Sequence, residues 1–267
     1  MNPASYWYAF SGILKRESLR FVHQRSRFFS SLIRPLLWLA VFAAGFRAAL
    51  GISIIAPYDT YITYEVYIVP GLVAMILLFN AMQSSLSMVY DREMGSMRVL
   101  LMSPLPRWYL LLSKLAASTL VAIPQVYAFL AIAWLFDVES PLIGLLWVAP
   151  AVILTGVLLG AIGLFISSFI KQLENFAGVM NFVIFPMFFM SSALYPLWKM
   201  QESSEWLYWL CSVNPFTFCV ELIRHALYGK LNGEALAVVS GCLLVFTLLA
   251  VLTFNPERGQ IGKSGRS

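Results

Sequence analysis

Six long stretches of apolar residues, separated by short polar segments, dominate the pattern along the chain. They cover residues 35–55, 66–90, 108–136, 142–170, 176–197 and 235–254. None shows the strict alternation that marks a strand of a membrane barrel, and each has about the length that crosses a bilayer as a helix. Because a helix satisfies its own backbone hydrogen bonds in lipid, the pattern predicts an all-α membrane protein with six transmembrane helices.

The composition supports this interpretation. Hydrophobic residues make up 60% of the chain and charged residues only 12%, whereas an average soluble domain has about 25% charged residues. Six spans and their connections use most of the 267 residues, so no large soluble domain is expected. The predicted organisation is an N-terminal segment 1–34, a transmembrane domain 35–254 and a tail 255–267.

Lysine and arginine residues gather on one side of the predicted spans and set the expected orientation. Of the 18 basic residues, only Arg47, Lys199, Arg224 and Lys230 fall on the other side, which carries most of the acidic residues. Since basic loops stay in the cytoplasm, both termini are expected there. Arg47 lies within the first predicted span, so its side chain is expected to reach the outer interface or a polar cavity.

The N-terminal segment 1–34 predicts an amphipathic helix. Arg16, Arg20, His23 and Arg27 lie close together on a helical wheel, and aromatic and aliphatic residues occupy the opposite side. Such a helix lies in the inner membrane interface with its basic face toward lipid headgroups or a cytoplasmic partner. Anchoring to headgroups alone is the alternative to partner contact.

The loop 91–107 between the second and third predicted spans gathers charge in an otherwise apolar region. Residues 91–104 predict a short helix that Asp91 caps and Pro104 ends. Its apolar stripe consists of Met94, Met97, Leu100 and Leu101, and its charged rim of Asp91, Arg92, Glu93 and Arg98. A helix of this kind, held between two spans, suits contact with a moving cytoplasmic partner, and an ordinary solvated loop is the alternative.

The segment 198–232 before the last span combines aromatic and charged residues. Its tryptophans and Tyr208 are typical of the membrane–water boundary. Asn214 and Pro215 are expected to separate two short helices, and Glu221 can pair with Arg224 because the two are three residues apart. The hairpin is too short and too charged to cross the membrane, which predicts a partly re-entrant external hairpin.

Single polar residues and cysteines each leave two alternatives. Asn80, Gln83 and Asn181 lie in the middles of predicted spans, where they line a translocation path or simply bond neighbouring helices. Cys211 and Cys219 are small apolar residues in or near lipid, or they form a disulfide.

Sequence motifs for catalysis or nucleotide binding are missing from the chain. "GKS" at 262–264 lacks the glycine that a phosphate-binding loop needs five positions before Gly262, where Glu257 stands. The two histidines, His23 and His225, fall on opposite sides of the membrane, and no span pairs two carboxylates. We therefore expect no enzyme and no catalytic, cofactor-binding or metal-binding residues.

Three motifs together resemble the type-2 ABC exporter permeases. They are "YDREMGSMRVLLMSPLPRWYLLLSKLAAS" from Tyr90, "YIVPGL" from Tyr67 and "NPFTFCVELIRHALYG" from Asn214. The likeness covers nearly the whole chain in order, and the first motif is closer to the drug-resistance exporters than to the O-antigen or nodulation-factor exporters. The resemblance implies a homodimer in the bacterial inner (plasma) membrane with two separate ATPase subunits, which bind the ATP and Mg²⁺.

The resemblance also implies roles for particular residues. Contact with the ATPase subunit is expected at Asp91, Arg92, Glu93, Gly95, Arg98, Ser103, Pro104, Arg16, Arg20 and Arg27. The external hairpin, with Asn214, Pro215, Glu221 and Arg224, is expected to cap the exit. The expected function is outward transport of an amphipathic substrate (drug-like, lipid or lipid-linked). The chain is expected to contact the lipid membrane and to bind no nucleic acid. A non-transporting membrane scaffold that recruits a cytoplasmic partner is the alternative.

Overall fold

The computed structural model describes residues 3–23, 25–46, 56–59, 62–95, 105–136, 138, 141–170 and 172–254, and these ranges contain no strand. The helices in chain order are α1 (Pro3–His23), α2 (Arg25–Phe46), α3 (Tyr64–Glu93), α5 (Arg107–Trp134), α6 (Leu142–Phe169), α7 (Leu173–Phe189), α8 (Leu197–Ser203), α9 (Glu205–Val213), α10 (Pro215–Leu227) and α11 (Gly233–Thr253). The expected all-α class is confirmed for this part of the chain.

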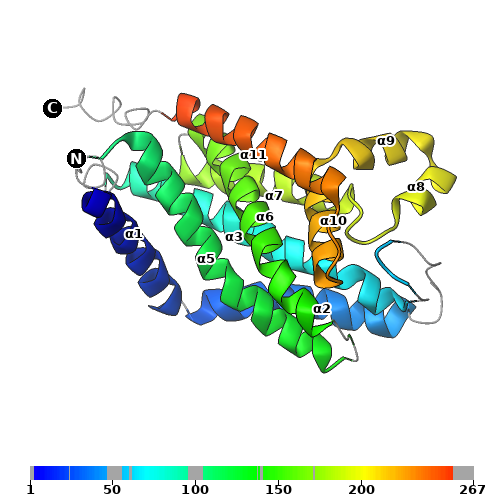
Figure 1. Ribbon diagram of the computed structural model, residues 1–267. Helices are drawn as coiled ribbons and strands as arrows, with labels where there is room; N and C mark the ends of the chain where they lie inside the picture. Colours follow the sequence, from blue (N-terminus) through cyan, green and yellow to red (C-terminus); the bar gives the residue numbers. More distant parts are fainter. Residues whose placement is uncertain are drawn as a thin grey trace.

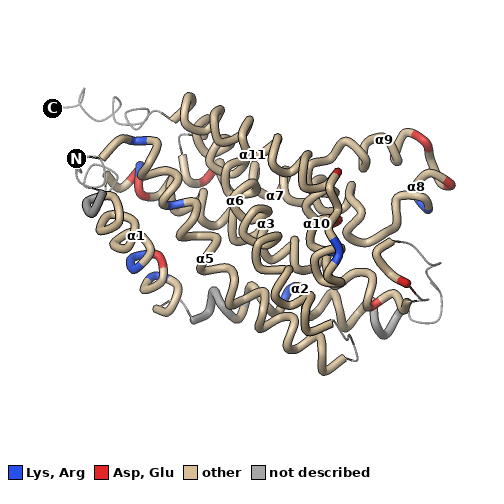
Figure 2. The backbone as a smooth tube through the Cα atoms, in the orientation of Figure 1, with Lys and Arg blue, Asp and Glu red and all other residues tan. Residues whose placement is uncertain are grey.

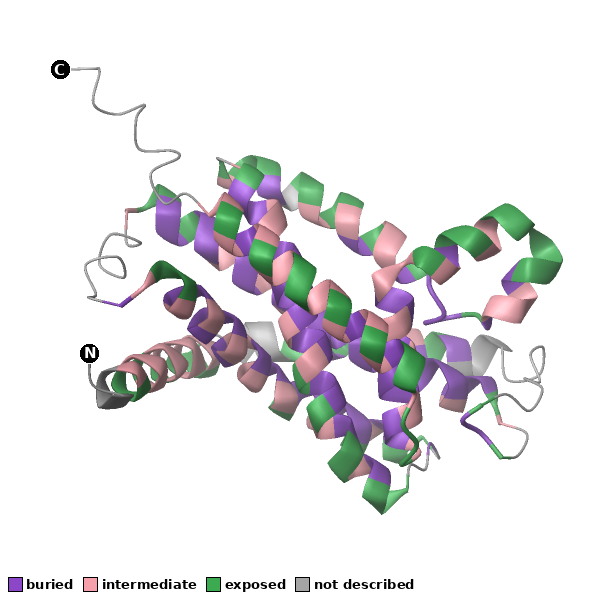
Figure 3. Cartoon of the chain, turned by 45° about the horizontal axis from the view of Figure 1, so that its top comes forward, coloured by how far each residue is buried: buried purple, intermediate pink, exposed green. Residues whose placement is uncertain are grey.

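The long helices form an elongated bundle (Figure 1). The beginning of α1 and the end of α11 lie at the same end of the bundle, and α8 and α9 project from the opposite end. Helix α3 forms the centre, since 83% of its apolar stretch is buried, whereas α11 on the outside buries only 17%. Figure 3 shows the same division between a buried middle and an exposed surface.

Four helices in the described ranges, α3, α5, α6 and α11, are long and apolar enough to cross a membrane. Helices α9 and α10 reach that length only as a pair, and they are bent by 73° at the break between them. Among the described side chains, Ser31–Phe42 of α2 is a shorter apolar stretch, and α7 has 17 residues. The predicted count of six spans is therefore matched by four or five candidates, and Arg47 lies outside the described residues.

Helix α7 is shorter than the predicted segment 176–197 because polar side chains bond its last carbonyl groups. The Asn214 amide nitrogen donates to the carbonyl oxygens of Met187 and Met190, at 2.9 and 2.6 Å. The Ser191 hydroxyl donates to the carbonyl oxygen of Phe188 at 2.6 Å. A helix end needs such partners, and here they replace the next helical turn.

Glycines of α6 allow its neighbours to approach closely. A Cβ atom on Gly163 would lie 2.3 Å from the Ser85 hydroxyl oxygen of α3, and one on Gly156 would lie 2.5 Å from a Thr119 methyl group of α5. Small residues of this kind are common where membrane helices pack. They bring α6 against both α3 and α5 near the junction described below.

Helix α1 packs along α5, where the Tyr109 hydroxyl donates to the Tyr6 carbonyl oxygen at 2.6 Å. Arg16 and Arg20 turn toward α3 and bond Asp91. This differs from the expectation that the basic face points to headgroups or a partner, because the buried carboxylate attracts both guanidinium groups. The side chain of Arg27 is outside the described residues, and a position of α1 in the membrane interface stays a prediction.

Helices α8, α9 and α10 form the predicted hairpin before α11. As expected from the Asn214–Pro215 motif, α10 begins at Pro215, and the Asn214 side chain caps it by accepting a hydrogen bond from the Phe216 amide at 3.0 Å. Cys211 and Cys219 are both buried and free, which favours packing over a disulfide. How far the hairpin enters the membrane stays a prediction.

Candidate coupling site at the end of α3

Asp91 in the last turn of α3 connects three helices. Its side chain is 2% exposed. One carboxylate oxygen lies 3.2 Å from Lys114 Nζ of α5, and both lie 3.3 Å from Arg16 Nη2 of α1. Arg20 Nη2, also of α1, is 3.5 Å from Oδ1. One buried carboxylate thus holds α1 and α5 against α3.

The cations around Asp91 differ in exposure, and so in how much they depend on it. Lys114 is 6% exposed, whereas Arg20 is 24% and Arg16 39% exposed. Arg20 also donates to the Ser87 hydroxyl at 3.0 Å and lies 3.8 Å from a Glu17 carboxylate oxygen. A buried charge needs a partner much more than an exposed one. Lys114 therefore relies on Asp91 most strongly.

Arg92 joins α3 to the end of α6. Its side chain is buried, and its guanidinium donates to the carbonyl oxygens of Ser167, at 3.0 Å, and Ile170. Carbonyl groups at the end of a helix lack intrahelical donors and carry partial negative charge. The Arg92 guanidinium supplies the missing hydrogen-bond donors and balances the partial negative charge.

Glu93 joins the end of α3 to the beginning of α7. Its carboxylate oxygen accepts a hydrogen bond from the backbone amide of Leu173, the first residue of α7, at 3.2 Å. An acidic group is favourable at a helix N-terminus, where amide groups are unpaired. In contrast to Asp91 and Arg92, Glu93 is exposed.

Three consecutive residues therefore attach the end of α3 to four other helices. Successive side chains on a helix point about 100° apart, so Asp91, Arg92 and Glu93 face different neighbours. We call these three residues and the groups they contact the α3-end junction. It holds charges and helix caps, and among the described residues no group of His, Cys, Asp and Glu could hold a metal ion. The junction can transmit a displacement of α3 to α1, α5, α6 and α7.

The prediction that Asp91 caps a separate short helix is wrong. Helix α3 continues through Glu93 because its partners hold all three residues in the last turn. Gly95 then adopts φ +75°, a left-handed conformation that ends helices and suits glycine. The predicted helix beyond it, with Arg98, Ser103 and Pro104, lies outside the described residues.

In the described part of the chain, no hydrogen bond joins the three predicted path residues to one another. The Asn80 amide donates to Gln125 of α5 at 2.5 Å and to the Ile76 carbonyl oxygen at 3.0 Å. Gln83 is partly exposed on α3, whereas Asn181 is exposed on α7. The contacts of Asn80 match the alternative of a bond between neighbouring helices.

At the other end of α3, Arg224 of α10 occupies a second buried charged site. Its side chain is 2% exposed and pairs with Glu221 at 2.5 Å, as the spacing predicts. It donates to the Ser192 carbonyl oxygen at 2.9 Å, and its guanidinium carbon lies 4.0 Å from the centre of the Tyr67 ring. We call Arg224 with Glu221, Tyr67 and Ser192 the α10 anchor.

The residues around the α10 anchor tie α3 to the turn between α7 and α8. The hydroxyl groups of Tyr64 and Tyr67 donate to the carbonyl oxygens of Leu194 and Ser192, at 2.8 and 2.9 Å. Tyr58, in the segment before α3, also lies near Arg224, and burial raises the pKa of its phenol. It therefore stays neutral at physiological pH.

Sequence reasoning placed Lys114 and Tyr67 in motifs but did not recognise their partners. A single lysine in an apolar span is costly without a counter-charge, so an aspartate at the end of the preceding span was the available signal for Lys114. No comparable signal marks the backbone carbonyl groups that Arg92 and Arg224 use. Those contacts depend on where helices end.

Comparison with known proteins agrees with this architecture. A sequence model of the ABC-2 type transporter family matches residues 8–228, which include both the α3-end junction and the α10 anchor. The chain is 28% identical over 219 residues to the putative transport permease ycf38 of Porphyra purpurea, covering 80% of this chain and 72% of that protein.

Two Escherichia coli proteins are also similar. Identity is 32% over 164 residues with the probable multidrug ABC transporter permease YbhR, covering 60% of this chain and 44% of YbhR. It is 25% over 244 residues with the inner membrane transport permease YadH, covering 90% and 91%. The chain belongs to the ABC-2 type transporter family, as a multi-pass membrane permease subunit of an ABC transporter, which implies an ATPase partner.

Proposed function

We propose that this permease exports an amphipathic substrate (drug-like, lipid or lipid-linked) across the bacterial inner membrane. Two copies of the chain work with two separate ATPase subunits, which bind the ATP and Mg²⁺. Both termini and the α3-end junction face the cytoplasm. The observation that carries the proposal is the Asp91–Glu93 triplet, because it joins one end of α3 to four other helices.

The mechanism is a rigid-body movement driven from the α3-end junction. Closure of the ATPase subunits on ATP displaces the chain that follows Gly95, and the junction passes this movement to α1, α5, α6 and α7 together. Helix α3 carries it to the α10 anchor at its other end. The hairpin then moves relative to the bundle and opens the exit.

The distribution of charge and the names of the relatives support the location and cargo. Arg16, Arg20, Arg92 and Lys114 cluster at the junction, as expected for a cytoplasmic end. The name of YadH supports the inner membrane, and that of YbhR, a probable multidrug permease, supports a drug-like cargo.

The first test asks whether an ATPase copurifies with the tagged permease expressed from its native operon. The complex is then reconstituted in liposomes, and ATP-dependent movement of ethidium and of a fluorescently labelled phospholipid is measured. Transport of either probe, with loss of transport but not of ATP hydrolysis in Glu93→Gln, is the expected result. A permease that binds no ATPase and moves neither probe would instead be the scaffold alternative.

A second test concerns orientation. Cysteine placed at Glu93 in a chain whose three native cysteines are replaced should react with a membrane-impermeant thiol reagent in inside-out vesicles only. Cysteine at Glu205 should react from the outside of intact cells. Reaction of the residue 93 cysteine from the outside contradicts the proposed mechanism.

A further inference from the structure

Polar residues follow one face of α3 and one face of α5, where the two helices meet. The members on α3 are spaced by four, three and four residues, which places them on one face: Asn80, Ser84, Ser87 and Asp91. The members on α5 also share a face: Lys114, Ser118 and Gln125. We call these seven residues the polar seam. From Asn80 to Asp91 it extends about 16 Å along α3.

Direct contacts close the polar seam at both ends. Lys114 Nζ lies 3.2 Å from Asp91, and the Asn80 amide donates to Gln125 at 2.5 Å. The two contacts set an antiparallel register, which brings the middle of the α3 stripe opposite Ser118 of α5. Among the described residues, no hydrogen bond joins Ser84 or Ser87 to Ser118. The middle of the seam is therefore polar on both sides without a direct bond across it.

A cavity of about 20 Å³ lies in this middle part, where α1 covers the polar seam. Polar residues of three helices line it: Asn80, Ser84, Ser87, Ser118, Glu17 and Arg20. Figure 2 shows the basic and acidic positions on α1. A cavity needs about 10–15 Å³ to hold one water molecule, and the water needs two to four polar partners. The cavity has the volume and the polar lining for one water.

Ser84 gives the strongest indication of a ligand. It is 9% exposed and lines the cavity, but its hydroxyl makes no hydrogen bond with any residue that the structure describes. The hydroxyl of Ser85, the next residue, donates to the Ala81 carbonyl oxygen of its own helix at 3.0 Å. Burial of a hydroxyl without a partner is costly. A polar ligand in the cavity removes that cost.

Neighbouring groups keep hydrogen-bonding capacity for the same ligand. The Ser118 hydroxyl donates to the Leu115 carbonyl oxygen at 2.9 Å, and its oxygen can still accept. Glu17 lies 3.8 Å from Arg20, and a carboxylate accepts several hydrogen bonds. Ser84, Ser118 and Glu17 thus offer one group each from α3, α5 and α1.

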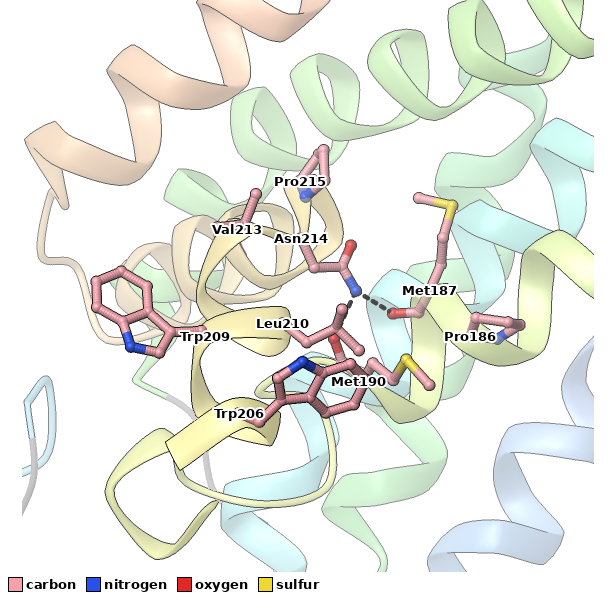
Figure 4. A pocket seen from close by; sticks show the side chains of 9 residues that line it. All are labelled: Pro186, Met187, Met190, Trp206, Trp209, Leu210, Val213, Asn214 and Pro215. Carbon is pink, nitrogen blue, oxygen red and sulfur yellow. Dashed lines mark hydrogen bonds between the residues drawn. The ribbon is translucent and has the colours of Figure 1, made fainter. Parts of the chain in front are cut away.

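A larger cavity, of about 570 Å³, differs in this respect. It lies between the end of α7 and the bend from α9 to α10, and Met187, Trp206 and Leu210 are part of its apolar lining (Figure 4). The Asn214 amide nitrogen there already donates to two carbonyl oxygens, and its oxygen accepts from the Phe216 amide. The polar group in that cavity is therefore paired, whereas the Ser84 hydroxyl has no partner among the described residues.

We propose that one water molecule binds in the cavity of the polar seam and bridges Ser84 of α3, Ser118 of α5 and Glu17 of α1. The water accepts a hydrogen bond from the Ser84 hydroxyl and donates to the Ser118 oxygen and the Glu17 carboxylate. It completes the seam between its two ends and joins α1 to both helices. This inference goes beyond the proposed export function, because the water site does not depend on what the permease transports.

The first test is cryo-electron microscopy of the complete transporter in lipid nanodiscs, at a resolution that shows ordered waters at other buried sites. A density peak is expected about 2.5–3.0 Å from Ser84 Oγ, with Ser118 and Glu17 oxygens at similar distances. The lack of a peak overturns the proposal. A peak held by six or more oxygens at about 2.3–2.6 Å is a cation such as Ca²⁺, and overturns it equally.

A double-mutant cycle with Ser84→Ala and Ser118→Ala tests the bridge in the same complex. The two hydroxyls are not bonded to each other, so energetic coupling between them reports a shared ligand. The unfolding temperature of the double variant is expected to fall by less than the sum of the single shifts, by about a third or more. The matched control combines Ser85→Ala with Ser118→Ala and is expected to be additive, because Ser85 bonds its own helix and faces Gly163 of α6.

Additive shifts for the Ser84 and Ser118 variants overturn the proposal. Equal coupling in the control pair overturns it as well, since that coupling would not come from the cavity. The density at Ser84 in the wild-type complex decides the question if the variants fail to assemble.

Discussion

The two ends of α3 both hold buried charge, but they do so in different ways. At the α3-end junction, one carboxylate is shared by Lys114, Arg16 and Arg20, and the two arginines remain partly exposed. At the α10 anchor, one fully buried arginine has a single carboxylate and otherwise backbone oxygens and an aromatic ring. The junction should tolerate the loss of one arginine, because the other cations still neutralise Asp91, whereas the α10 anchor depends on its single arginine.

This difference fits two mechanical roles. A cluster of several ion pairs can exchange partners as helices shift, which suits the end that the ATPase subunits move in the proposed mechanism. The single arginine in the α10 anchor fixes α10 and the turn after α7 to α3 in one geometry. The predictions below separate these roles by the size of the effect.

The largest effect is expected for Arg224→Ala. The change removes the counter-charge of Glu221 and one of the two hydrogen bonds that the Ser192 carbonyl oxygen accepts, and losing one member of a buried pair costs about 3–5 kcal/mol. Thermal unfolding of the purified complex should show a strong loss of stability. Lys230→Ala is the control, because its pair with Asp59 is exposed and such pairs contribute about 0–1 kcal/mol. Equal effects of the two variants would contradict the role of the α10 anchor.

Asp91→Asn is expected to have the next largest effect, about 3 kcal/mol, since Lys114 loses its counter-charge in a buried position. The added change Lys114→Met removes the unpaired charge and should recover part of the stability, because apolar replacements of buried pairs are often tolerated. The double-mutant cycle is measured by the same unfolding assay. Additive losses would show that the two residues do not depend on each other.

A smaller effect is expected for Arg16→Ala. Lys114 and Arg20 still neutralise Asp91, and Arg16 is 39% exposed, so the loss should be about 1 kcal/mol or less. The comparison with Asp91→Asn tests the idea of shared partners directly. A loss as large as that of Asp91→Asn would show that Arg16 alone carries the pairing.

Glu93→Gln should change stability least, by about 0.3–1 kcal/mol, because its contact with the start of α7 is exposed. Its expected effect is on the proposed coupling, so ATP hydrolysis by the complex continues while transport falls. Gln172→Ala, an exposed neighbour at the same turn, is the control. Normal transport by Glu93→Gln would remove this residue from the coupling path.

The sequence predicted the apolar helices, the start of α10 at Pro215 and the Glu221–Arg224 pair, because each depends on residues close together in the chain. It did not predict that α3 continues through Glu93. That continuation rests on Ser167, Ile170 and Leu173, which lie far along the chain. Hydropathy contains no signal for such partners.

The end of α7 was also not predicted from the sequence, because distant polar groups set it. Residues after Phe189 remain apolar enough to extend a span, yet Asn214 and Ser191 bond the last carbonyl groups of the helix. Likewise, the basic face of α1 was predicted from its own spacing, but its direction is set by Asp91 on another helix. The local pattern of apolar and polar residues predicts that these helices form. Polar groups far along the chain determine where the helices end and which neighbours they face.

The Asp91–Glu93 triplet constrains how α3 can change in length during evolution. Inserting or deleting one residue in the last turns of this helix would rotate all three side chains by about 100° and release four neighbours at once. A substitution disturbs the contacts of only one of the three residues. Homologous chains should therefore keep a fixed spacing through α3, and gaps in their alignment should begin only after Gly95, where the helix has ended.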